Sequence, residues 1–112
     1  MTAEDITPRH SPEAHRYELV DGDRVVGHTR YRPHEGGAGP QRIFFHTVVD
    51  DAYEGQGLGS RLAAFALRDT AAAGAAVVLV CPFLKNYVKR HEELAENVVA
   101  VRPEHLQAID GR

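Results

Sequence analysis

The sequence predicts a mixed α/β (α+β) domain. It should have a mixed, mostly antiparallel, twisted sheet with two main helices packed on it. Alternating strand patterns joined by turn residues fill the first half of the chain, which is typical of an antiparallel meander. In the second half, two segments with apolar residues three and four positions apart flank one short, wholly apolar run. Such a strand–helix–strand order predicts a crossover between parallel strands. We therefore expect residues 1–112 to form one domain, which is large enough to bury a core.

The first strands are expected to form hairpins. Residues 1–14 are polar and interrupted by prolines, so they either contain a short edge strand beginning at Ile6 or are frayed. Residues 16–20 alternate as a strand should, and residues 21–23 supply a turn. Residues 24–32 follow as the partner strand.

The middle of the chain predicts a loop and a strand–helix–strand unit. Residues 33–41 contain three glycines and two prolines, which indicates a flexible hairpin loop. A β-rich run at residues 42–49 predicts a strand, and a helix is expected from about residue 57 to residue 73, with Gly74 placed to end it. The apolar run at residues 75–81 is typical of a buried central strand.

The last part of the chain predicts a second helix and a weak tail. Pro82 breaks the apolar run, and helical periodicity returns over residues 83–96. The tail, residues 98–112, is expected to add a strand at 98–101 and a short turn after Pro103. The strand ends before the two helices should lie at one edge of the sheet, where such sheets bind ligands.

Composition restricts the function classes. A net charge of −3 gives no basic surplus for nucleic acid, and no apolar run approaches the ~20 residues of a membrane span. The polar start of the chain does not resemble a secretory signal, and the single cysteine cannot form an internal disulfide, so we expect a cytoplasmic protein. The histidines lack metal-ligand spacing, and we expect no metal. The sheet edges and the apolar tail permit a homodimer.

Glycines at alternate positions, Gly55, Gly57 and Gly59, stand where the strand at 42–49 meets the first helix. Bare backbone and unpaired N–H groups at a helix N-terminus suit an anion, most often a phosphate. A glycine-rich turn without a ligand is the other interpretation. A Walker A loop needs a lysine after the glycines, and a dinucleotide fingerprint needs its third glycine one position later, so both motifs are disfavoured.

The loop Glu54-Gly55-Gln56-Gly57-Leu58-Gly59 resembles the acyl-CoA loop of the GNAT superfamily of N-acetyltransferases, Arg/Gln-x-x-Gly-x-Gly/Ala. The chain is most similar to a branch of very small, single-domain GNAT-like proteins, which have His-Thr-x-Val before the loop and Cys-Pro-Phe/Tyr with an aromatic helix after it. The corresponding segments are His46-Thr47-Val48-Val49, Cys81-Pro82-Phe83-Leu84 and Tyr87-Val88-Lys89-Arg90-His91. The resemblance covers roughly residues 16 to 96. Two positions depart from the pattern: Glu54 replaces Arg or Gln, and Glu92 replaces a proline.

This resemblance implies that acetyl-CoA is the co-substrate. The backbone of the glycine loop would hold the pyrophosphate, and Ser60 or Arg61 would add a side-chain contact, although Arg61 is equally typical of a solvated helix residue. The end of the strand would pair with the pantetheine arm, and one of its N–H groups would polarise the thioester carbonyl. The residues expected to contact acetyl-CoA are Val48, Val49, Glu54, Gly55, Gln56, Gly57, Leu58, Gly59, Ser60, Arg61 and Asn86.

Three side chains are candidates for the chemistry. A lone cysteine after an apolar run is usually a small buried hydrophobe. Cys81 also stands before a proline and a helix N-terminus, so we expect it at an exposed mouth, where it either carries the acetyl group or lines the site during direct transfer. His46 is either a general base or a core histidine. Tyr87 is either the residue that protonates the departing thiolate, as in GNAT-like enzymes, or a core aromatic. Lys85, Lys89 and Arg90 form either a basic patch for the nucleotide 3′-phosphate or a solvated face.

The sequence therefore predicts an acetyl-CoA-dependent N-acetyltransferase that acts on a primary amine of a small molecule or a protein. The alternative is a non-catalytic acyl-CoA-binding module on the same scaffold. No sequence feature identifies the acceptor amine.

Overall fold

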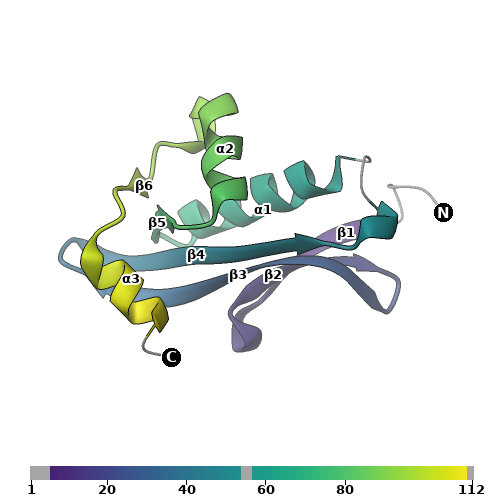
Figure 1. The fold of residues 1–112 in the computed structure, drawn as a ribbon, viewed down its shortest axis with the longest axis horizontal. Coiled ribbons are helices and arrows are strands. Elements are labelled where there is room, and N and C mark those ends of the chain that lie inside the picture. Colours follow the sequence, from purple (N-terminus) through teal and green to yellow (C-terminus); the bar gives the residue numbers. More distant parts are fainter. Residues whose placement is uncertain (1–5, 54–56, 111–112) are drawn as a thin grey trace.

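The computed structural model describes residues 6–53 and 57–110, which form one six-stranded sheet with helices on both faces (Figure 1). The strands stand side by side in chain order. They are β1 (Ile6–Ser11), β2 (Arg16–Asp21), β3 (Arg24–Gly36), β4 (Gly39–Val49), β5 (Ala76–Leu79) and β6 (Val98–Val99). The helices are α1 (Leu58–Ala72), α2 (Pro82–Arg90) and α3 (Pro103–Asp110), and short 3₁₀ turns lie at Pro12–Ala14, Asp51–Tyr53 and Glu92–Leu94.

The predicted fold class is confirmed. β1 to β4 are antiparallel to their neighbours, and β5 and β6 extend the sheet in parallel. α1 and α2 lie on one face, which we call the inner face, and α3 lies on the opposite, outer face near the β3–β4 hairpin (Figure 1). None of the described helices combines the length and the apolar character that a membrane span requires.

The N-terminal hairpins agree with the prediction except at one loop. Ile6 is wholly buried and begins the edge strand β1, one of the two possibilities that the sequence left open. The flexible loop predicted for residues 33–41 is wrong, because β3 and β4 pair up to a two-residue turn. Two prolines fit into these strands because each has a neighbour on one side only. Pro33 lies beyond the β2 pairing, and Pro40 precedes the β5 pairing.

One β-bulge in β4 decides which side chains reach the inner face. The register between β3 and β4 skips Phe45, which is an extra residue on β4. In a regular strand, the inward Phe44 would be followed on the same face by His46 and then Val48. The bulge shifts this alternation by one residue, so Thr47 faces inward and His46 lies exposed on the outer face.

The predicted first helix is confirmed as α1, and its C-terminus is a Schellman motif. Gly74 has a φ of +79° and donates its N–H to the Ala71 carbonyl at 3.0 Å. The N–H of Ala75 donates to the Thr70 carbonyl at 3.1 Å. Glycine is needed at position 74 because other residues are strained in this left-handed conformation.

Three elements near the C-terminus differ from the prediction. β5 ends at Leu79 instead of residue 81, because the next two N–H groups both turn to one carbonyl of β4. α2 ends at Arg90 instead of residue 96, because His91 leaves the helical conformation with φ −135° and ψ 68°. The short turn expected after Pro103 is the eight-residue helix α3, whose docking on the sheet involves residues distant in the sequence.

A polar group inside the inner layer ties α1 to the sheet. Tyr17 is wholly buried, and its hydroxyl donates to Asp69 Oδ2 of α1 at 2.7 Å. Arg42 of β4 donates to the Tyr17 hydroxyl at 2.5 Å and to Thr70 Oγ1 at 3.3 Å. Burial raises the pKa of Tyr17, so its hydroxyl stays protonated and remains a donor.

His105 holds α3 against the outer face. Only 1% of this residue is exposed, and its Nδ1 accepts a hydrogen bond from the Arg102 N–H at 2.9 Å. Its Nε2 must then carry the proton and donate to Gln41 Oε1 of β4, 2.8 Å away. Ile43 and Val78, which pair across β4 and β5, are fully buried on this side of the sheet.

We expect acidification to destabilise the protein. Burial lowers the pKa of His10, His28 and His105 below 6.5, so the unfolded chain takes up protons at a higher pH than the folded protein does. The free energy of unfolding should therefore fall as pH drops through 6.5, and His105→Gln should reduce this dependence. Urea denaturation at pH values above and below 6.5 measures both effects; equal stability on both sides would contradict the expectation.

Candidate active site

The pairing between β4 and β5 ends at one backbone position. β5 pairs with β4 only as far as Phe44, whose carbonyl then accepts the N–H groups of Val80 at 2.9 Å and Cys81 at 3.0 Å. Pro82 begins α2 directly afterwards. β4 continues for five further residues, 45–49, without a neighbour on that side among the residues that the structure describes.

The last part of β4 offers backbone hydrogen-bonding groups along this unpaired edge. The N–H of Asp50 donates to the Val26 carbonyl of β3 at 2.8 Å. Because backbone groups point alternately to the two sides of a strand, Val48 also faces β3, and Thr47 and Val49 face the unpaired side. Of the two valines expected to pair with pantetheine, Val49 therefore presents its backbone there.

The start of α1 is an open helix N-terminus beside the end of β4. Its N-cap is Gly57, with φ +73° and no side-chain cap. The N–H of Arg61 bonds to the Gly57 carbonyl at 3.2 Å, so the preceding N–H groups of Leu58, Gly59 and Ser60 have no acceptor within the helix. The positive end of the helix dipole lies at the same place, and the arrangement suits an anion.

Gly59, the last glycine of the predicted loop, lies against the start of α2. A Cβ atom on Gly59 would come within 2.8 Å of Phe83 Cζ, so a glycine here lets the two helices approach closely. The two motifs therefore meet at one edge of the sheet, as the strand order predicts. Glu54, Gly55 and Gln56 of the predicted loop lie outside the described residues.

Cys81 is buried beside a threonine. It is the N-cap of α2 and only 4% exposed, so the exposed mouth expected for it is wrong; Thr47 and the surrounding core cover it. Its Sγ lies 3.2 Å from Thr47 Oγ1, which in turn lies 2.9 Å from the Oγ1 of the fully buried Thr29. Thr47 was not among the predicted site residues, although it is the second position of the His-Thr-x-Val motif.

α2 presents one face to the core and another to solvent. Tyr87 belongs to the same buried cluster as Cys81, and its ring stacks on His91 with centroids 4.1 Å apart. Asn86 is exposed and borders a hollow of about 420 Å³ on the solvent side of α2. The other residues around this hollow are Phe83, Lys89 and Arg90. Two of the three predicted basic side chains thus stand beside the phenylalanine that contacts the glycine loop.

His46 is not beside Cys81. The bulge turns it to the outer face, where it is exposed and its ring centroid lies 5.8 Å from that of His28. The interpretation as a buried core histidine is therefore wrong. The imidazole of His46 is therefore open to solvent on the outer face, and its role as a general base stays a prediction.

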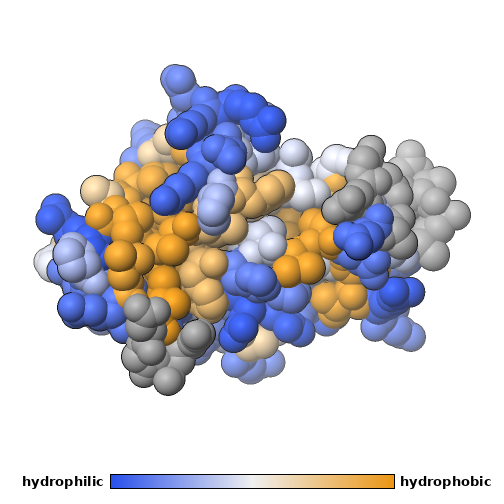
Figure 2. Space-filling model, in the orientation of Figure 1, coloured by the Kyte–Doolittle hydropathy of each residue, from blue (hydrophilic) through white to orange (hydrophobic). Residues whose placement is uncertain are grey.

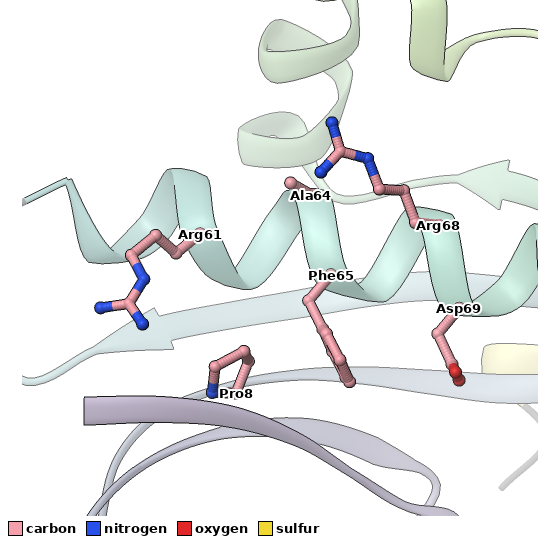
Figure 3. A pocket seen from close by; sticks show the side chains of 6 residues that line it. All are labelled: Pro8, Arg61, Ala64, Phe65, Arg68 and Asp69. Carbon is pink, nitrogen blue, oxygen red and sulfur yellow. The ribbon is translucent and has the colours of Figure 1, made fainter. Parts of the chain in front are cut away.

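A separate hollow of about 470 Å³ lies between α1 and β1 (Figure 3). Its lining residues are Pro8, Arg61, Ala64, Phe65, Arg68 and Asp69. Arg61 points toward β1, and its Nη2 donates to the Ile6 carbonyl at 2.7 Å (Figure 3). This side chain therefore joins α1 to the edge strand and is not simply solvated; its contact with a pyrophosphate stays a prediction.

One group of potential metal ligands lies beside α3. His34, Glu104 and His105 place ligand atoms within 4.8 Å of one another. Both ring nitrogens of His105 are already engaged, with the Arg102 N–H and with Gln41. In a metal-bound histidine the second nitrogen normally donates a proton, but here Nδ1 faces a donor. These contacts fit a clamp between α3 and β4 better than a cation site.

The fold and this edge define a class of protein that can hold an anionic cofactor with an extended arm: unpaired strand backbone continues into an open helix N-terminus. Residues 16–98 match the family model described as GCN5-related N-acetyl-transferase. The chain therefore belongs to this family of N-acetyltransferases, which generally use acetyl-CoA. A comparison with curated protein sequences gives no match.

Removal of the Thr47 hydroxyl should destabilise the fold. Thr47→Val leaves the buried Thr29 hydroxyl without its partner, which costs about 1–3 kcal/mol. Thr47→Ser keeps the hydroxyl and should lose less stability. Urea denaturation compares the two variants, and a Thr47→Val protein that is at least as stable as Thr47→Ser would contradict the role of this contact.

Proposed function

We propose that this protein is an acetyl-CoA-dependent N-acetyltransferase that acetylates a primary amine. The observation that carries the proposal is the unpaired end of β4 beside the open N-terminus of α1, in a chain that belongs to an N-acetyltransferase family. The two features offer hydrogen bonds to the two polar parts of the co-substrate: strand backbone for the amides of the pantetheine arm, and helix N–H groups for the pyrophosphate.

The donor would extend along the inner side of the β4 edge. The backbone of Val49 would pair with the pantetheine arm, and the N–H groups of Leu58, Gly59 and Ser60 would hold the pyrophosphate. Lys89 and Arg90, beside the exposed Asn86, would meet the nucleotide 3′-phosphate. In this arrangement the thioester lies near Thr47 and Cys81.

The reaction would be direct transfer. The neutral amine attacks the thioester carbonyl carbon, the C–N bond forms as the C–S bond breaks, and the amine proton passes to His46. The departing thiolate takes the hydroxyl proton of Tyr87. The burial of Cys81 and its contact with Thr47 support a role in shaping the site rather than in carrying the acetyl group.

The second candidate is an acyl-CoA-binding module without transferase activity. The described residues 6–53 and 57–110 provide few elements beside the end of β4 that could build an acceptor pocket, which favours this candidate. Release of free CoA in a mixture of primary amines distinguishes the two functions. Turnover would exclude the pure binding module.

The proposal includes a cytoplasmic location and self-association through the β6 edge of the sheet. Hydrophobic residues gather on the surface over β5, β6 and the adjoining part of α3 (Figure 2). Val99, Val101 and Leu106 are large hydrophobic side chains that remain exposed, between 37% and 46%. Burial of these side chains against a second copy would remove apolar surface from water.

Acetyl-CoA should bind at the start of α1. Ser60→Glu places a carboxylate in the first turn of α1. The carboxylate interacts favourably with the helix dipole, so the helix should stay folded, but it repels the pyrophosphate. We expect the dissociation constant measured by calorimetry to rise about fivefold or more, because two unit charges ~4 Å apart repel by about 1 kcal/mol even in water. Ser60→Gln, which has a similar size and no charge, is the matched control. Equal affinity of the two variants for acetyl-CoA would show that the pyrophosphate does not bind at the start of α1.

Cys81→Ser should retain acetyl transfer. If the amine attacks acetyl-CoA directly, the variant still turns over, and the mass spectrum of the wild-type protein with acetyl-CoA alone shows no added acetyl group. A stoichiometric acetyl adduct that disappears in Cys81→Ser, together with loss of turnover, would instead establish transfer through the cysteine.

A further inference from the structure

The outer face of the sheet carries two cross-strand rows of mostly cationic and histidine side chains. Directly paired residues of an antiparallel sheet project to the same face. The bulge in β4 brings His46 onto this face, opposite Arg30. One row consists of Ser11, Arg16, Arg30 and His46, and the other of Arg9, Glu18, His28 and Val48. We call Arg9, Arg16, Arg30, His28 and His46 the outer basic face.

Positive charge is in excess on this face. Glu18 is the single carboxylate in the two rows, is only 2% exposed, and accepts hydrogen bonds from Arg9 at 2.8 Å and Arg16 at 2.6 Å. Burial alone would raise the pKa of Glu18, but these two bonds hold it below the usual value, so the carboxylate stays charged. Three arginines against one glutamate leave two positive charges with the histidines neutral.

Arg30 carries charge that no neighbouring carboxylate neutralises within the described residues. Its guanidinium lies over the ring of Phe45, 5.4 Å from the centroid, which leaves its N–H groups available to a ligand. Burial lowers the pKa of His28, and the charges of Arg16, His46 and Arg30 lower it further, against the opposite effect of Glu18.

This face adjoins the end of β4 that the proposed function assigns to the donor. His46 and Val48 project outward and alternate with Thr47 and Val49, whose backbone groups line the unpaired edge. α3 covers the opposite end of the outer face, near the β3–β4 hairpin, and among residues 6–53 and 57–110 no helix covers this end (Figure 1). An amine that arrives here meets His46 before it reaches the edge.

The dimensions favour an extended polypeptide. The first row crosses four strands, so its ends are three strand spacings apart, or about 14 Å. Cations spread over this distance match carboxylates on successive residues of a peptide better than those of one small amine. The protein as a whole is acidic, with a net charge of −3, so a basic area is not a general property of its surface.

We propose that the outer basic face binds an acidic polypeptide segment and that the acceptor amine is a lysine side chain within that segment. This inference rests on the proposed function for the transfer step, but the binding step can be measured without it. Negatively charged residues on both sides of the lysine would pair with Arg30 and with the Arg9–Arg16 group, and His46 would stand next to the lysine amine.

The test uses a fluorescent peptide in which glutamates flank one lysine, and a neutral peptide with glutamines in their place. Fluorescence anisotropy should give at least about fivefold tighter binding of the acidic peptide, with the difference decreasing at high salt. Arg30→Glu should weaken this binding by about fivefold or more. The matched control is Arg68→Glu, an exposed arginine on α1 that makes the same change of charge elsewhere and should leave binding within about twofold.

Several results would overturn the inference: equal affinity for the two peptides, equal losses in the two variants, or tighter binding of an oligonucleotide of the same charge than of the acidic peptide. Acetyl-CoA calorimetry on Arg30→Glu separates this inference from the proposed function. If the acidic peptide binds but is not acetylated, the proposed acetyltransferase activity is wrong and the binding role of the outer basic face still holds. If both peptides are acetylated at the same rate, the proposed acetyltransferase activity holds and the binding role of the outer basic face is wrong.

Discussion

The end of the β4–β5 ladder at Phe44 is the constraint on which the rest of the site depends. One carbonyl accepts two successive N–H groups, from Val80 and Cys81, so the chain of β5 can no longer advance along β4. Pro82 cannot donate to a ladder and instead starts a helix. The same event therefore ends the β4–β5 pairing, begins α2, buries Cys81 beside Thr47 and leaves the β5 side of residues 45–49 without a neighbour in the part of the chain that the structure describes.

The bulge at Phe45 adds a second constraint, which separates the chemistry onto two faces. Before the bulge, Phe44 belongs to the inner core; after it, Thr47 replaces His46 on that face. In the proposed reaction, the thioester lies on the inner side of β4 and the imidazole of His46 lies on the outer side, so the two groups meet across the edge of β4 that has no described neighbour.

Polar contacts in the layers on both sides of the sheet hold this arrangement in place. On the inner side, Tyr17 donates to Asp69, and Arg42 donates to Tyr17 and Thr70, so the C-terminal half of α1 is fixed and its N-terminus points at the end of β4. On the outer side, His105 bonds to Gln41 and fixes α3 over the hairpin end of the sheet. No described helix covers the end of the outer face that carries the histidine pair, because α3 is tied to the other end (Figure 1).

The sequence by itself determined the order of elements from β2 to α2, the fold class, the family and the approach of Gly59 to the Cys-Pro-Phe turn. These features follow from local periodicity, from glycine and proline positions and from motif spacing, which one stretch of chain contains in full. Only the tertiary structure decided which face His46 occupies, how deeply Cys81 is buried and which hydroxyl it contacts. A one-residue bulge leaves no signal in the alternation of Ile43 to Val49, yet it exchanges the two faces of the strand, because strand side chains have a period of two.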